Sequence, residues 1–132
     1  KAYEVLSNRH DFVVVEGIGG LMVPVDDTLF VADLVRKMDL PLVIVGSDYL
    51  GTINHTLLTV EYAKSRNIRI KGIIINMLKG DDGFVREIEK YSSVPILGTI
   101  PFKENVSVEN CVYGDIVEDL RREINISKIM RK

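Results

Sequence analysis

The stretch LVIVGSDYLGTINHTLLTVEYAKSRNIRIKGIIIN, residues 42–76, decides the fold. It opens with the apolar run LVIV at 42–45 and closes near III at 73–75, the pattern of strands that are covered on both faces. Between these runs, apolar residues recur at spacings that place them on one face of a helix, namely Leu57, Leu58, Val60, Tyr62 and Ala63. A strand, a helix and a second strand in this order predict a right-handed parallel crossover.

The flanking sequence repeats this alternation. FVVV at residues 12–15 has the pattern of another interior strand, and VPILGTI predicts a further strand that starts at Pro95. The first ten residues have the pattern of the end of an earlier helix, and further helices are predicted around 29–38, 84–91, 115–123 and 126–131. The sequence therefore predicts a single α/β domain over residues 1–132, with a doubly wound, mostly parallel sheet of four strands.

The edges of this predicted sheet pose a problem. Only VPILGTI, with its proline, is typical of an edge strand, whereas the other three runs are typical of interior strands. We therefore expect a further strand, from a missing N-terminal portion or from a partner, to pair with this sheet.

Composition excludes several classes of function. The chain has 132 residues and a formal net charge of −2, and its Lys and Arg residues are scattered, which argues against binding nucleic acid. It has no apolar run of the roughly 18 residues that a membrane span needs and no signal-like stretch at its start, so a cytoplasmic protein is expected. The single cysteine, Cys111, provides neither an internal disulfide nor a zinc ligand set.

In such sheets ligands bind outside the carboxyl ends of the strands. After FVVV come Glu16, Gly17, Ile18, Gly19 and Gly20: a carboxylate that can hold magnesium and glycines that let backbone N–H groups approach a phosphate. The alternative is a turn that needs positive φ beside a solvated glutamate.

Two further strand ends carry polar groups. The helix that begins near Gly51 or Thr52 can hold a carboxylate or phosphate at its N-terminus, with Thr52 and Asn54 as added donors, although ordinary capping is the alternative. Asn76 presents an amide that can read an adenine edge. Pro101 and Phe102 can form the wall of a base site or a packed loop.

Four segments in this order and spacing, EGIGGLMVP, LGTINHTLLTVEYAK, GIIIN and PILGTIPF, make the chain resemble the C-terminal part of dethiobiotin synthetase from Asp11 to about Glu109. The resemblance implies a P-loop NTPase-like fold and a ligase that uses ATP and Mg2+. This ligase takes up CO2 on 7,8-diaminononanoate as a carbamate, which ATP phosphorylates before the second amine closes the ureido ring.

The resemblance also implies roles for single residues. Glu16 would be the magnesium ligand, and Gly17, Ile18 and Gly19 would line the phosphates. The nucleotide would further contact Asn76, Pro101, Phe102, Lys103 and Glu109. Gly51, Thr52, Ile53 and Asn54 would hold the carboxylate tail of the diamino acid in the active site of the other subunit, which implies a homodimer.

One departure from the family pattern is large. The run G-x-x-x-x-G-K-[ST] of the P-loop does not occur in this sequence, so the P-loop segment is expected outside it. Since the phosphates would lose most of their contacts, the chain alone is expected to be inactive. Two alternatives stay open: a non-catalytic nucleotide-sensing or dimerisation module, and a related amidoligase or cobalamin-pathway ATPase, which LGTINHTLLT disfavours.

Overall fold

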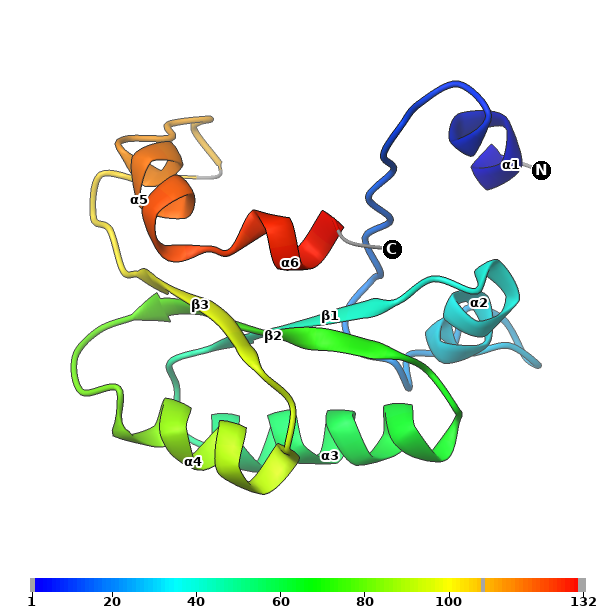
Figure 1. Cartoon of the computed structure of the whole chain (residues 1–132), viewed down its shortest axis with the longest axis horizontal. Coiled ribbons are helices and arrows are strands. Elements are labelled where there is room, and N and C mark those ends of the chain that lie inside the picture. Colours follow the sequence, from blue (N-terminus) through cyan, green and yellow to red (C-terminus); the bar gives the residue numbers. More distant parts are fainter. Residues whose placement is uncertain (1, 108, 131–132) are drawn as a thin grey trace.

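The computed structural model describes residues 2–107 and 109–130 and shows a parallel sheet with helices on both faces (Figure 1). The elements are α1 (Ala2–Ser7), α2 (Val31–Met38), β1 (Leu42–Ser47), α3 (Thr52–Ser65), β2 (Ile70–Leu78), α4 (Gly83–Ser92), β3 (Ile96–Pro101), α5 (Ile116–Glu123) and α6 (Ile126–Met130). The strand order is β1-β2-β3, with α3 and α4 on one face and α5 and α6 over the other (Figure 1). The predicted α/β class with a parallel sheet is confirmed, with three strands in the described residues instead of four.

The crossover from β1 through α3 to β2 forms where the sequence predicts it. Thr52, Thr56, Val60 and Ala63 recur every three or four residues and are the buried residues of α3. Gly46 of β1 permits this close packing, because an added Cβ would lie 3.3 Å from Thr56 Oγ1.

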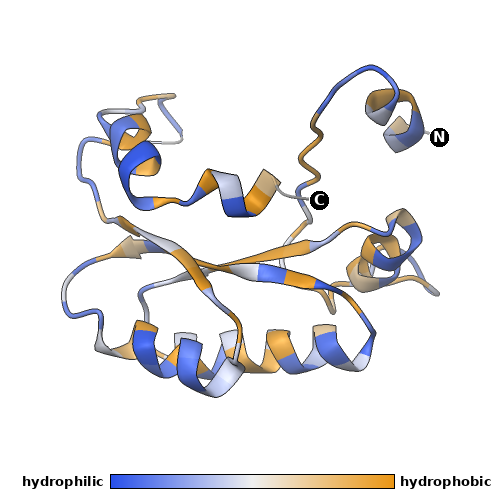
Figure 2. Cartoon of the chain, in the orientation of Figure 1, coloured by the Kyte–Doolittle hydropathy of each residue, from blue (hydrophilic) through white to orange (hydrophobic). Residues whose placement is uncertain are grey.

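The core lies between the sheet and the helices α3 and α4. Ile73 and Ile75 of the central strand β2 are fully buried, together with Val60 of α3 and Ile88 of α4. Figure 2 shows the apolar colour concentrated along the strands, and the hydrophilic colour over much of α4 and α5. Among the described residues, no helix combines the length and the apolar composition needed to cross a membrane.

The prediction of a strand at residues 12–15 is wrong for this structure. The segment is irregular, and Phe12, Val14 and Val15 are 46%, 80% and 46% exposed. The prediction that LVIV is an interior strand is also wrong: β1 is an edge strand, and Val45 is 62% exposed. Both runs have the composition of covered strands, but a strand needs a hydrogen-bonding neighbour, and the described residues do not supply one on this side.

The C-terminal helices cover the second face of the sheet through a close backbone approach. An added Cβ on Gly98 of β3 would lie 2.2 Å from the carbonyl oxygen of Glu123, at the end of α5. The backbone N–H of Asn125 donates to the carbonyl of Leu97 at 3.1 Å, and Lys71 Nζ donates to the carbonyl of Ile129 at 2.9 Å. Glycine at position 98 is therefore what lets α5 and α6 reach the sheet.

Candidate functional site

The candidate site lies at the carboxyl edge of the sheet. Ser47, the last residue of β1, pairs with Asn76, and Leu78, the last residue of β2, pairs with Pro101, the last residue of β3. The parallel order therefore places Asn76, Pro101 and the loop after β1 side by side, as expected for the ligand-binding edge of such a sheet.

Asn76 is held by its own local backbone. Its Oδ1 accepts a hydrogen bond from the N–H of Met77 at 2.9 Å, and Met77 adopts a left-handed conformation with φ 58°. No partner of the Asn76 Nδ2 occurs within residues 2–107 and 109–130. This amide donor is therefore available to a ligand, as reading of a base edge requires.

The loop after β1 makes two contacts that hold the segment after Asn76. The backbone N–H of Asp48 donates to the carbonyl of Asn76 at 3.2 Å, and Asp48 Oδ2 accepts from the backbone N–H of Lys79 at 2.9 Å. Sequence reasoning assigned Asp48 no role, although it directly follows a strand, the position that drew attention to Asn76.

Phe102 forms a partly exposed wall beside this segment. The backbone N–H of Phe102 donates to the carbonyl of Leu78 at 2.9 Å, and Phe102 is 41% exposed. Lys79 Nζ lies 5.0 Å from the centre of the Phe102 ring, within the range of a cation–π contact. One aromatic face and one cation thus stand at the carboxyl edge of the sheet, which also carries Asn76.

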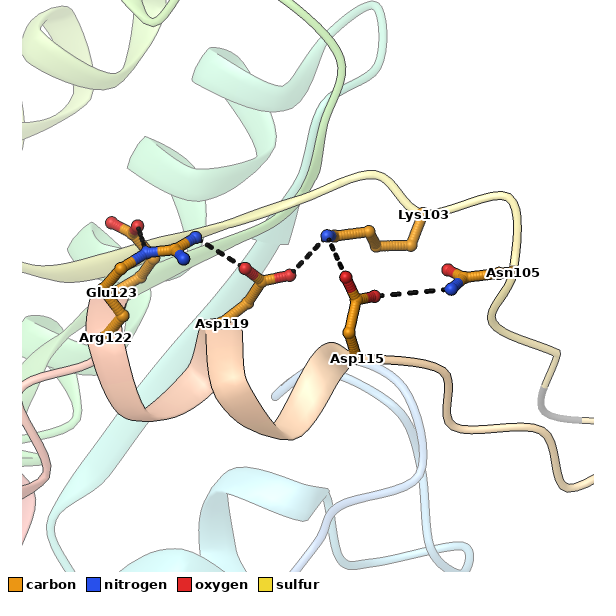
Figure 3. A network of polar contacts seen from close by, with 6 residues as sticks. All are labelled: Lys103, Asn105, Asp115, Asp119, Arg122 and Glu123. Carbon is orange, nitrogen blue, oxygen red and sulfur yellow. Dashed lines mark hydrogen bonds and ion pairs between the residues drawn. The ribbon is translucent and has the colours of Figure 1, made fainter.

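Lys103 points toward α5 (Figure 3). Its Nζ lies 2.9 Å from Asp119 Oδ2 and 3.0 Å from Asp115 Oδ2, and hydrogen bonding to Asp119 and then Asp115 raises the pKa of Lys103. Asp119 is buried, and its other oxygen is 2.6 Å from the guanidinium of Arg122. The Lys103 ammonium is thus committed to two aspartates, so what Lys103 presents to the strand end is its backbone.

Glu109, the remaining residue of the expected nucleotide set, is exposed in a turn. It lies between Ser107 and Val112, which form an isolated antiparallel bridge. In the described part of the chain, no hydrogen bond or ion pair joins Glu109 to Asn76.

The start of α3 stands at the same edge as Asn76. Gly51 caps the helix with φ 95°, and the N–H of Thr52 donates to the carbonyl of Tyr49 at 3.1 Å. Thr52 is only 5% exposed, and its buried Oγ1, which has no partner in the described residues, faces Gly46 of β1. Asn54, by contrast, is exposed. A carboxylate that approaches α3 from outside would therefore meet backbone N–H groups and Asn54 rather than the Thr52 hydroxyl.

His55 completes the first turn of α3. It is exposed, its Nδ1 is 3.0 Å from the hydroxyl of Tyr49, and its ring lies 3.4 Å from the place of an added Cβ on Gly51. Leu50, between Tyr49 and Gly51, is fully exposed.

The structure does not bring Glu16 to this edge. An added Cβ on the adjacent Gly17 would lie 3.2 Å from Val31 Cγ1, and Val31 belongs to a cluster that packs with Leu42 and Ile70, the first residues of β1 and β2. Glu16 itself is exposed, as are Ile18 and Gly19. Across the described ranges, no group of three His, Cys, Asp or Glu side chains gathers to hold a metal ion.

A family model described as "AAA domain" matches residues 1–110. The chain belongs to this family. Its ATPase-type α/β fold agrees with the P-loop NTPase-like fold expected from the sequence.

Curated relatives narrow the relationship. The ATP-dependent dethiobiotin synthetase of Bacillus velezensis is 43% identical over 130 residues, covering 95% of this chain and 54% of the relative. That of Bacillus subtilis strain 168 is 39% identical, covering 98% of this chain and 58% of the relative. That of Methanocaldococcus jannaschii is 36% identical, covering 82% of this chain and 53% of the relative. The AAA-domain chain is thus homologous to dethiobiotin synthetase and spans about half the length of these relatives.

Proposed function

We propose that the chain, as one domain, is the C-terminal portion of an ATP-dependent dethiobiotin synthetase. The observation that carries this proposal is the convergence of Asn76, Phe102 and the start of α3 at one sheet edge, in a chain that is 43% identical to one such synthetase. This edge joins a base-reading amide, an aromatic wall and an anion-binding helix terminus, which are the groups that a nucleotide and a carboxylate substrate need.

The nucleotide would bind across the ends of β2 and β3. Asn76 would donate to the adenine edge, Pro101 and Phe102 would flank the base, and the backbone of Lys103 would follow them. Glu109 would approach from the exposed turn after β3. A base that stacks on Phe102 would displace the Lys79 ammonium from the ring, a cation–π contact of modest strength at an exposed site.

The carboxylate tail of 7,8-diaminononanoate would bind at the start of α3. Gly51 and Ile53 would contribute backbone N–H groups, and Asn54 its side-chain donor. Thr52, whose N–H donates to the Tyr49 carbonyl, would join them only by exchanging that bond for one to the carboxylate. We propose that this helix terminus serves the active site of a second subunit. Exposed apolar side chains beside it, at Tyr49 (52%), Leu50 (100%) and Leu58 (60%), support a homodimer contact here.

The phosphate half of the site requires a further strand. We propose that the P-loop portion of the protein pairs with the open edge of β1 and brings residues 12–15 into the sheet, which would bury their exposed apolar side chains. This movement would place Glu16 at the carboxyl edge and Gly17, Ile18 and Gly19 against the phosphates. A single carboxylate fits Mg2+, because this ion commonly takes one or two carboxylates and completes its shell with water and phosphate oxygens.

The reaction that follows is an ATP-dependent ring closure. One amine adds to CO2 and loses a proton to form a carbamate, whose oxygen accepts the γ-phosphoryl group of ATP with release of ADP. The second amine then attacks the carbamoyl carbon and loses a proton, the C–O bond to the phosphoryl group breaks, and inorganic phosphate leaves as the ureido ring closes. Bound Mg2+ would supply charge neutralisation at the phosphates, while this chain's residues hold the base and the carboxylate tail in place.

Reconstitution tests the proposal. The chain is co-expressed with the part of the Bacillus velezensis synthetase that lies outside the matched region, and dethiobiotin formation is measured with ATP, 7,8-diaminononanoate and bicarbonate. We expect turnover with both parts and none with the chain alone. A co-folded complex that binds ATP without turnover would instead support the non-catalytic module, and one that binds neither ATP nor the diamino acid would refute the proposal.

A further inference from the structure

We infer that Asp48 is a positioning residue for base recognition: it holds the Asn76–Lys79 segment in the conformation in which the Asn76 amide discriminates adenine from other bases. This inference rests on the function proposed above. It concerns a residue that lies on a different strand end from Asn76 and that has no direct contact with a base in the proposed site.

The first observation is that one residue holds this segment at both ends. The Asp48 N–H donates to the Asn76 carbonyl at 3.2 Å, and the Asp48 carboxylate accepts from the Lys79 N–H at 2.9 Å. The two partners of Asp48 are 28 and 31 positions away from it along the chain, so these contacts do not arise from local structure. A carboxylate that accepts from a backbone N–H makes a stronger bond than a neutral acceptor does.

The second observation is that the held segment is strained. Met77, between the two contacts, has a φ of 58°, a region that non-glycine residues rarely adopt. The pairing of β2 with β3 also shifts register between Ile75 and Leu78. Such backbone persists only where the surroundings hold it. On the β1 side, the hydrogen bonds of Asp48 stabilise this backbone conformation. On the β3 side, the hydrogen bond from the Phe102 N–H to the Leu78 carbonyl stabilises it.

The third observation links the strain to the amide. Asn76 Oδ1 accepts from the Met77 N–H at 2.9 Å, so the direction of the Met77 peptide sets the direction of the Asn76 amide plane. If the Asp48 carboxylate is removed, the Met77 backbone can leave its left-handed conformation. The side-chain amide of Asn76 then no longer has a fixed orientation. An amide distinguishes adenine from guanine only when Nδ2 donates to a ring nitrogen while the second lone pair of Oδ1 accepts from the adenine amino group. This pair of bonds depends on the orientation of the amide plane, so the discrimination between bases falls, and not only the overall affinity.

The experiment measures kcat/KM for ATP and for GTP in the reconstituted protein. We expect Asp48→Ala to lower the ATP-to-GTP ratio about tenfold, the scale of losing one directional hydrogen bond to the base. Asp48→Asn keeps a neutral acceptor for the Lys79 N–H, so we expect it to retain most of the ratio. Asp82→Ala is the matched control: it removes an exposed carboxylate from the next loop, where Asp82 pairs with Arg86 at 3.3 Å, and we expect an unchanged ratio.

A double variant separates positioning from a structural role. In an Asn76→Ala background, Asp48→Ala should leave the ATP-to-GTP ratio unchanged, because its effect runs through the amide. An equal fall of kcat/KM for both nucleotides, or an additive effect on the ratio in the double variant, would overturn the inference. If Asp48→Ala does not fold, the small fall of the ATP-to-GTP ratio expected for Asp48→Asn decides. A fall that is absent in the Asn76→Ala background supports the inference, whereas no fall, or the same fall in both backgrounds, overturns it.

Failure of the proposed function gives a different result. A reconstituted wild-type protein without turnover, or without preference for ATP, would refute the base site itself. A wild-type preference for ATP that survives intact in Asp48→Ala would refute only the role of Asp48.

Discussion

Gly98→Ala tests how the C-terminal helices dock on the sheet. The added Cβ would lie 2.2 Å from the Glu123 carbonyl oxygen and 2.7 Å from Ile124 Cδ1. Optimal non-bonded separations are about 3.5 Å, so the end of α5 must move away from β3 by about 1 Å. Overpacking of this kind costs about 1–3 kcal/mol, and the bond from Asn125 N–H to the Leu97 carbonyl adds about 1 kcal/mol if it breaks.

The free energy of unfolding in urea, followed by circular dichroism, measures this cost. Amide hydrogen exchange at Asn125 shows whether α5 and α6 have lifted, and we expect faster exchange in the variant. Gly80→Ala is the matched control, because no atom lies within 4 Å of its added Cβ, and we expect a change of about 0.5 kcal/mol or less. A Gly98→Ala protein that matches wild type in both stability and Asn125 protection would refute the described approach of α5 to β3.

Three further predictions concern single side chains. In the reconstituted protein, Glu16→Gln should reduce turnover at limiting Mg2+ at least tenfold without lowering the unfolding temperature, because the side chain is exposed; a loss of folding instead would mark Glu16 as structural. Asn54→Ala should raise KM for 7,8-diaminononanoate more than KM for ATP, and equal increases in steady-state assays would contradict its place at the carboxylate. The hydrogen bond from Lys103 lowers the pKa of Asp115, so the stabilisation it provides is present above the ordinary aspartate pKa and is lost as the pH falls through the lowered value. Lys103→Met should therefore be less stable than wild type at neutral pH, with a difference that shrinks in strong acid; a difference that stays constant down to pH about 2 in chemical denaturation would exclude this linkage.

Much of the fold follows from the sequence because its determinants are local. The apolar runs at 42–45 and 73–75 and the helical periodicity between them specify strand, helix and strand, and chirality then makes the crossover right-handed. The topological rule that ligands bind at strand carboxyl ends also directed attention to Asn76 and to the start of α3, and the structure places both at one edge.

The strand count was not predictable from the same signals. An apolar run indicates that a segment is suited to burial, but it does not indicate which neighbouring segment would cover it. FVVV therefore has the composition of an interior strand while it is irregular and exposed in this structure, and LVIV lies at an edge. Glu16, which directly follows FVVV, is likewise exposed in this structure.

The sequence by itself determined the fold class, the crossover and the residues that stand at the strand ends, since each depends on the chemistry of a short segment. Only the tertiary structure decided which of these side chains are occupied by other parts of the protein. It turns Lys103 toward Asp115 and Asp119, buries the hydroxyl of Thr52 against β1, and gives Asp48 its contacts with Asn76 of β2 and with Lys79 just after β2. These side-chain positions depend on contacts between residues that are distant in the sequence, and residue spacing along the chain does not predict such contacts.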